Sequence, residues 1–264
     1  MTKVRRIVLS KFDFPIELDR SIVDGIIKGY KDYLAVRAEM QKRLKVSAAY
    51  AWTKGNHIDS FVNAECAQYD EIESTIEKAG YTWEYIQFTI KSSNEKYLLM
   101  IKNSGGIKRA FTYQEQTASR QNYLTEYAAI NNHLLGDQAL STSDSKGIIQ
   151  LELSIPELDA IQNNVALKAP EGYDRFYVVT YEFDSDSKMI SKIALTLPNQ
   201  HEMKLIEVAD LTPFISSSKV SINDNELAPV KNEQVPDSVY SGDTESFGYG
   251  VATNKPADSD QAVK

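Results

Sequence analysis

The sequence has 264 residues and a formal net charge of −8, a length that fits one large domain or two small ones. Cys66 is the single cysteine, which excludes an intrachain disulfide and a Cys-based zinc site. No run approaches the ~18 apolar residues of a membrane helix, and the basic first residues lack the apolar core of a secretory signal, so we expect a cytoplasmic protein without membrane association.

A long amphipathic helix, or two helices joined near Gly25 and Gly29, is predicted from residue 15 to residue 44, where apolar residues recur at three- and four-residue steps. Gly25 and Gly29 lie inside it, although each glycine costs about 1 kcal/mol relative to alanine in a helix interior. Their four-residue spacing places them on one face, so we predict a close contact with another helix. Residues 54–57 are predicted to form a loop.

A second helix is predicted at residues 70–79, because acids lie in its first turn, Lys78 in its last, and Gly80 directly follows. Alternating aromatic and β-branched residues then predict a hairpin at residues 81–91 and 96–103. Further elements are predicted along the chain: a strand at 107–112, a helix at 114–135, a strand at 148–153, and a short helix at 154–161.

The clearest hairpin joins residues 175–183 to residues 189–197. Both faces of its first strand are apolar, so we expect that strand to be central in its sheet. Residues 204–208 form either one more strand or a short helix, and Leu211 and Phe214 are the last residues expected to contact the core.

These elements predict one α+β domain over residues 1–215, with an antiparallel or mixed sheet of five to seven strands and helices packed mainly on one side. Residues 216–264 have few large apolar side chains and are predicted to be a disordered acidic tail. The tail holds four lysines and eight acids, so its net charge of −4 leaves −4 for the domain. Any nucleic-acid surface must therefore be local.

One candidate catalytic group consists of His57, Asp59 and Glu65, which can bind a divalent ion or serve as acid and base. A hairpin carrying Lys102 follows, in the order found in metal-dependent nucleases of the restriction-enzyme type. Position 100 is methionine where such a nuclease needs an acid, so no metal site or other cofactor is predicted. The simpler interpretation is that Asn56 or Asp59 caps a helix and that His57 is exposed.

A candidate nucleic-acid surface lies in the same hairpin region. Aromatic residues interleaved with cations are what single strands need for stacking and charge neutralisation. The residues concerned are Trp83, Tyr85, Lys91, Lys96, Lys108 and Arg109. A sheet face covered by a helix requires the same aromatic residues, and that alternative stays open.

Two stretches, residues 52–62 followed by 79–83 and residues 177–199, resemble an uncharacterised family from Firmicutes and their mobile elements. Some of its members are encoded beside regulator or antitoxin genes. The resemblance spans about residues 10–215 and implies a mobile-element or stress-linked role, with growth inhibition as one form. It implies nothing about mechanism.

Two functions follow as hypotheses. The first is an intracellular effector linked to a mobile element or prophage, such as the toxin of a toxin–antitoxin pair, that acts by binding a cellular macromolecule. Its partner would be a protein, such as an antitoxin or regulator, or a nucleic acid held by the local basic patch. The alternative is a metal-dependent nuclease acting on RNA or DNA, with His57, Asp59, Glu65 and Lys102 as its site.

Overall fold

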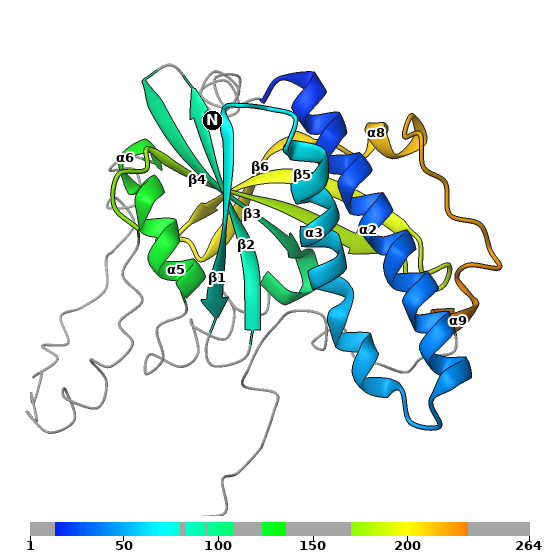
Figure 1. Cartoon of the computed structure of the whole chain (residues 1–264). Coiled ribbons are helices and arrows are strands. Elements are labelled where there is room, and N and C mark those ends of the chain that lie inside the picture. Colours follow the sequence, from blue (N-terminus) through cyan, green and yellow to red (C-terminus); the bar gives the residue numbers. More distant parts are fainter. Residues whose placement is uncertain (1–13, 80–82, 93, 108–122, 136–169, 232–264) are drawn as a thin grey trace, which may run out of the picture.

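The computed structural model describes residues 14–79, 83–92, 94–107, 123–135 and 170–231 (Figure 1). Its centre is a six-stranded sheet whose strands follow one another in chain order. The strands are β1 (Ile72–Ala79), β2 (Trp83–Ser92), β3 (Glu95–Asn103), β4 (Arg175–Phe183), β5 (Ile190–Asn199) and β6 (Lys204–Asp210). Only β3 and β4 run parallel. The predicted α+β class with a mixed sheet is therefore confirmed.

Helices cover the two faces unequally. Two long helices, α2 (Ile16–Arg43) and α3 (Lys54–Cys66), lie side by side on one face and are joined through the 3-10 helix η1 (Ala48–Thr53) (Figure 1). The other face carries three short pieces: α5 (Tyr123–Ala128), η2 (Ala129–Asn131) and α6 (Asn132–Leu135). Each face has its own apolar cluster. The prediction that helices pack mainly on one side is confirmed.

The predicted close helix contact lies between α2 and α3. A Cβ atom added to Gly29 would lie 2.5 Å from the Cα atom of Ile58, and one added to Gly25 would lie 2.6 Å from the Cα atom of Val62. Ile58 and Val62 are fully buried. The two glycines therefore allow the two helix backbones to approach directly.

Two local predictions are wrong. Residues 70–79 were expected to be helical, but they contain strand β1, paired with β2 over its whole length. Its β-branched residues Ile72, Thr75 and Ile76 suit a strand, and pairing with β2 overrides the apparent helix-capping signals. Residues 54–57 were expected to be a loop but form the first turn of α3.

Most other elements agree with expectation. Both hairpins form, and β4 lies in the interior of the sheet between β3 and β5. Residues 204–208 belong to β6. Residues 104–107 form a helical turn instead of starting the expected strand; the rest of that strand and the elements expected at 148–153 and 154–161 lie outside the described residues.

The described chain continues past residue 215, where the sequence analysis placed the end of the domain. After α8 (Pro213–Ser216), residues 217–231 run along α2 as a strap that ends in α9 (Ala228–Lys231) (Figure 1). Leu227 and Val230 are buried in the main core. The low hydrophobicity of the strap concealed them, because only a few apolar side chains anchor it; Val220 and Ile222 also pack partly against the same core. Residues 232–264 lie outside the described part.

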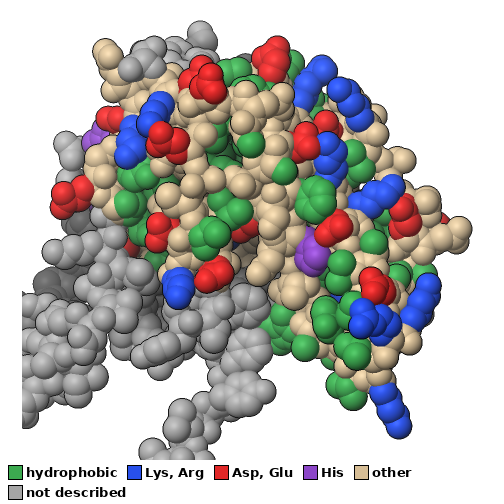
Figure 2. All heavy atoms as spheres, viewed as in Figure 1, with side chains coloured by type: hydrophobic (Ala, Val, Ile, Leu, Met, Phe, Trp, Pro, Cys, Tyr) green, Lys and Arg blue, Asp and Glu red, His purple; other side chains and the backbone are tan. Residues whose placement is uncertain are grey.

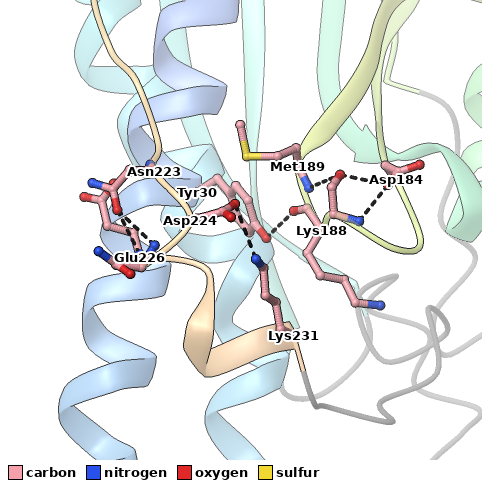
Figure 3. Close-up of polar contacts among 10 residues, drawn as sticks. Tyr30, Asp184, Lys188, Met189, Asn223, Asp224, Glu226 and Lys231 are labelled. Carbon is pink, nitrogen blue, oxygen red and sulfur yellow. Dashed lines mark hydrogen bonds and ion pairs between the residues drawn. The ribbon is translucent and has the colours of Figure 1, made fainter.

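Polar contacts hold the strap and the β4–β5 turn to α2. Figure 3 shows the contact of Tyr30 with the turn and the pair of Lys231 with Asp224 inside the strap. The amide of Gln41 on α2 donates to the carbonyl of Pro229 over 2.9 Å. On the neighbouring turn, the hydroxyl of Tyr30 donates to the carbonyl of Lys188 over 2.7 Å. Within the strap, Lys231 pairs with Asp224 at 3.3 Å. These contacts fix the strap at the edge of the helical layer, away from β1. No helix in the described ranges is long and apolar enough to cross a membrane.

Candidate functional site

β2 and β3 pair along only part of their length, and Asp59 lies where the two strands separate. The two strands are in register only from Phe88 opposite Leu99 to Ser92 opposite Glu95. Earlier in β2 the backbone N–H of Ile86 points toward β3 but donates over 3.2 Å to a carboxylate oxygen of Asp59, which projects from α3. Asp59 therefore replaces a missing strand partner.

The Asp59 carboxyl group is buried, and this burial raises its pKa to about 6. The nearby ammonium group of Lys102 and the hydrogen bond from Ile86 oppose the rise. Tyr181 on β4 is also close, since burial and then the charge of Asp59 raise the pKa of its hydroxyl. The buried carboxyl group of Asp59 and the half-buried ammonium group of Lys102 thus lie close together where β2 and β3 separate.

Lys102 points to the α5 side of the sheet, where aromatic residues surround it. Its Nζ atom lies 4.4 Å from the ring centroid of Tyr85 and 5.8 Å from that of Tyr123. Burial works against its charge, but Tyr123 and Asp59 outweigh burial and raise the pKa of the ammonium group. The ammonium group therefore stays protonated at neutral pH, held by a carboxylate and two aromatic rings.

The predicted catalytic set is only partly brought together. Asp59 and Lys102 are neighbours, but His57 lies on another side of α3, where its Nδ1 atom is 2.7 Å from Asp32. Glu65 pairs with Lys28 at 2.5 Å. Within the described ranges, no three side chains of histidine, cysteine, aspartate or glutamate lie close enough together to hold a metal ion.

The predicted nucleic-acid residues are also separated. Tyr85 is buried beneath Tyr123, whose ring centroid lies 5.4 Å from its own, so the aromatic ring serves a helix contact. Lys91 pairs with Glu73, and Lys96 lies over the ring of Tyr173 at 4.4 Å. The side chain of Trp83 and the residues Lys108 and Arg109 lie outside the described residues. The arrangement of Tyr85 favours the alternative of a helix-covered sheet face.

Lys54 is a buried cation that sequence reasoning missed. Its Nζ atom lies 4.1 Å from the ring centroid of Phe183, 5.4 Å from that of Tyr30 and 5.5 Å from that of Tyr33. These rings come from α2 and β4, so no local pattern around residue 54 could have revealed the cluster. The contacts anchor the first turn of α3 against the sheet.

The edge of β1 that faces away from β2 has no strand partner among the described residues, and the helix prediction for residues 70–79 did not anticipate it. β1 lies at one end of the strand order and pairs without interruption from Ile72 opposite Ile90 to Ala79 opposite Trp83. Residues 73–78 are all exposed, and Ile76 is 69% exposed. In Figure 1 this strand stands in front of the sheet, with no described helix before it.

The direction of the backbone groups along β1 follows from one hydrogen bond. The N–H of Lys91 donates to the carbonyl of Glu71, so odd-numbered residues exchange their bonds with β2. In an antiparallel ladder this orientation alternates. The N–H and C=O groups of Ser74, Ile76 and Lys78 therefore point away from the sheet and are available to another strand, whereas the N–H of Ile72 donates to the carbonyl of Tyr69 over 3.1 Å.

The two faces of β1 differ in chemistry. Side chains opposite each other in an antiparallel pair share a face, so Ile72 and Ile76 lie on the α3 side, next to Ile90 and Ile86. Glu73 and Glu77 lie on the α5 side. One face is therefore apolar and the other acidic. In Figure 2, hydrophobic and acidic side chains both reach the surface seen in this view.

The opposite edge of the sheet is less suitable for pairing. The register of β6 with β5 shifts between Leu195 and Thr196, leaving Val208 without an opposite residue. A bulge of this kind bends the strand and interrupts the row of free backbone groups. Ile206 and Val208 also pack partly against the core. The uninterrupted edge is thus that of β1.

Comparisons with protein families, with curated proteins and with solved structures found no match to this chain.

Proposed function

We propose that this protein is an intracellular effector that acts by binding another protein through the free edge of β1. The observation that carries the proposal is the regular backbone edge of β1, exposed over residues 73–78, with the 69% exposed side chain of Ile76 near its centre. Long regular edges invite pairing with another chain, and an extended segment added there gains hydrogen bonds along its whole length. Soluble proteins usually block such edges unless they are used.

The geometry supports binding better than hydrolysis. A nuclease site would need His57, Asp59, Glu65 and Lys102 in one cleft, whereas His57 and Glu65 pair with Asp32 and Lys28 on α2. Asp59 and Lys102 do approach each other, but Asp59 is buried, Lys102 is half-buried, and both serve the packing of the sheet. Only two of the four groups that the nuclease alternative requires therefore lie close together.

The resemblance to a mobile-element family suggests the biological setting of the proposal. In that setting the effector is the toxin of a toxin–antitoxin pair, and the protein partner is either its cellular target or an antitoxin or regulator. Strand addition suits both kinds of partner, because backbone pairing supplies affinity while the side chains on either face supply specificity.

The test uses proline at a position that leaves the sheet intact. The N–H of Ile76 points outward, so Ile76→Pro removes a donor of the free edge without removing a bond to β2. Ile76→Thr keeps that donor, and Val46→Ser removes another exposed apolar side chain away from β1. Each variant is expressed in a bacterium that lacks the neighbouring genes, and growth is recorded.

We expect wild type, Ile76→Thr and Val46→Ser to slow growth and Ile76→Pro to have no effect. Unaffected growth at high expression of the wild type would end the toxin form of the proposal. Equal inhibition by Ile76→Pro would show that the edge of β1 is not used. If purified protein then bound an RNA or DNA oligonucleotide, the target would be a nucleic acid and not a protein.

A further inference from the structure

The chemistry of the two faces of β1 specifies the kind of strand that can pair with it. This inference rests on the proposed function and goes on to name the partner class. An added strand places alternate side chains on the apolar face, beside Ile72 and Ile76, and on the acidic face, beside Glu73 and Glu77. Cross-strand neighbours of like charge are destabilising and those of opposite charge are stabilising.

The acidic face has an excess of negative charge. Glu71, Glu73 and Glu77 are exposed there, and Lys91 compensates only one of them, through its pair with Glu73. On the apolar face, Lys78 has Glu84 directly opposite in β2. A partner strand therefore gains most when its side chains on the acidic face are lysine or arginine and those on the other face are apolar.

A second copy of this chain could form the backbone hydrogen bonds with β1, but it would bring like charges together. Two copies related by a two-fold axis perpendicular to the sheet can place Ile76 opposite Ile76, which aligns all outward backbone groups. That register leaves Glu73 and Glu77 of both copies together on one face, as diagonal neighbours about 7–8 Å apart. The adjacent permitted register, with Thr75 opposite Thr75, places Glu73 directly opposite Glu77 twice.

We infer that the free edge of β1 binds an extended segment of another protein in which apolar and basic residues alternate. The basic side chains lie against Glu73 and Glu77, and the apolar ones lie against Ile76. Backbone pairing contributes equally to the binding of any extended strand. The positive charge of the alternate residues makes the binding of such a segment stronger than the binding of a second copy of this chain.

Three labelled peptides of eight residues test this. One alternates valine and lysine, one has the same composition as four valines followed by four lysines, and one alternates valine and glutamate. Binding is measured by fluorescence anisotropy with wild type, Ile76→Pro, Ile76→Thr and the double variant Glu73→Lys/Glu77→Lys. Both glutamates are exposed, so the charge reversal should alter stability little. The sedimentation of each protein gives its oligomeric state.

We expect wild type and Ile76→Thr to bind the alternating valine–lysine peptide about tenfold more tightly than the block peptide, a difference of about 1.4 kcal/mol. Ile76→Pro should lose this preference, and Glu73→Lys/Glu77→Lys should prefer the valine–glutamate peptide. Equal binding of the two alternating peptides by wild type would overturn the inference. So would a wild-type dimer that Ile76→Pro dissociates, because a second copy would then occupy the edge.

The two proposals can fail separately. If Ile76→Pro abolishes growth inhibition but wild type binds no alternating peptide, strand addition stands and the apolar–basic partner is wrong. If the valine–lysine peptide binds in the expected order while wild type leaves growth unaffected, the partner class stands and the toxin form of the proposed function is wrong.

Discussion

Replacing Gly29 by alanine should destabilise the protein because the helices α2 and α3 touch at that point. The new Cβ atom would lie 2.5 Å from the Cα atom of Ile58 and 2.7 Å from the carbonyl oxygen of His57. Carbon atoms in contact prefer about 3.5–4.0 Å, so the helices must separate by about 1 Å. The atoms in the way belong to the backbone of α3 and cannot rotate aside.

The magnitude follows from two opposing effects. Overpacking of this kind costs about 1–3 kcal/mol, and we expect the upper end because backbone is displaced. Alanine returns about 1 kcal/mol through its higher helix propensity. The net loss in the free energy of unfolding should be about 2 kcal/mol, or roughly 4–8 °C in Tm for an ordered region of this size.

Urea unfolding followed by circular dichroism measures this loss. Gly55→Ala is the matched control, because Gly55 also lies in a helix but a Cβ atom there meets nothing within 4 Å. We expect the control to be as stable as wild type or more stable, by at most about 1 kcal/mol. A Gly29→Ala protein as stable as wild type would refute the close contact, and an equal loss in Gly55→Ala would show that the cause is not the clash.

Three further outcomes can be checked with the same protein. Folding raises the pKa of Asp59 from 3.8 to about 6, so the folded protein binds more protons and the contribution of Asp59 to stability falls as pH rises from about 4 to 7. Relative to Asp59→Asn, the free energy of unfolding of the wild type should fall by about 3 kcal/mol across that range. A difference that does not change with pH would contradict the raised pKa. Leu227→Ala should cost about 2–5 kcal/mol because Leu227 is fully buried, and an unchanged urea midpoint would mean that the strap is not part of the core. Burial raises the pKa of the Cys66 thiol to about 12, so iodoacetamide at pH 8 should label it only in urea, and rapid labelling of the native protein, followed by mass spectrometry, would argue against its burial.

Local sequence patterns were sufficient to predict an element where the periodicity of its apolar residues favours one kind of structure. Residues close together in the chain predicted the close helix contact at the two glycines of α2, the interior strand β4 and both hairpins. Between 70 and 79 the same approach failed, because capping signals and β-branched residues compete there. Only pairing with β2 decides between a helix and a strand at that point.

The candidate site depended almost wholly on tertiary structure. Asp59 and Lys102 were named from sequence, but their meeting where β2 and β3 separate, away from His57 and Glu65, requires α3 to be placed on the sheet. Lys54 gained its aromatic neighbours in the same way. Contacts between residues far apart in the chain leave no local periodicity to recognise.

The sequence by itself determined that this is an α+β protein, that α2 packs closely against a second helix, and that residues 175–197 form a hairpin. The tertiary structure alone decided that β1 is an edge strand, which of its backbone groups face outward, and that one of its faces is apolar and the other acidic. The physical reason is that a strand becomes an edge only through the neighbour it lacks. That property belongs to the assembled sheet and not to the segment.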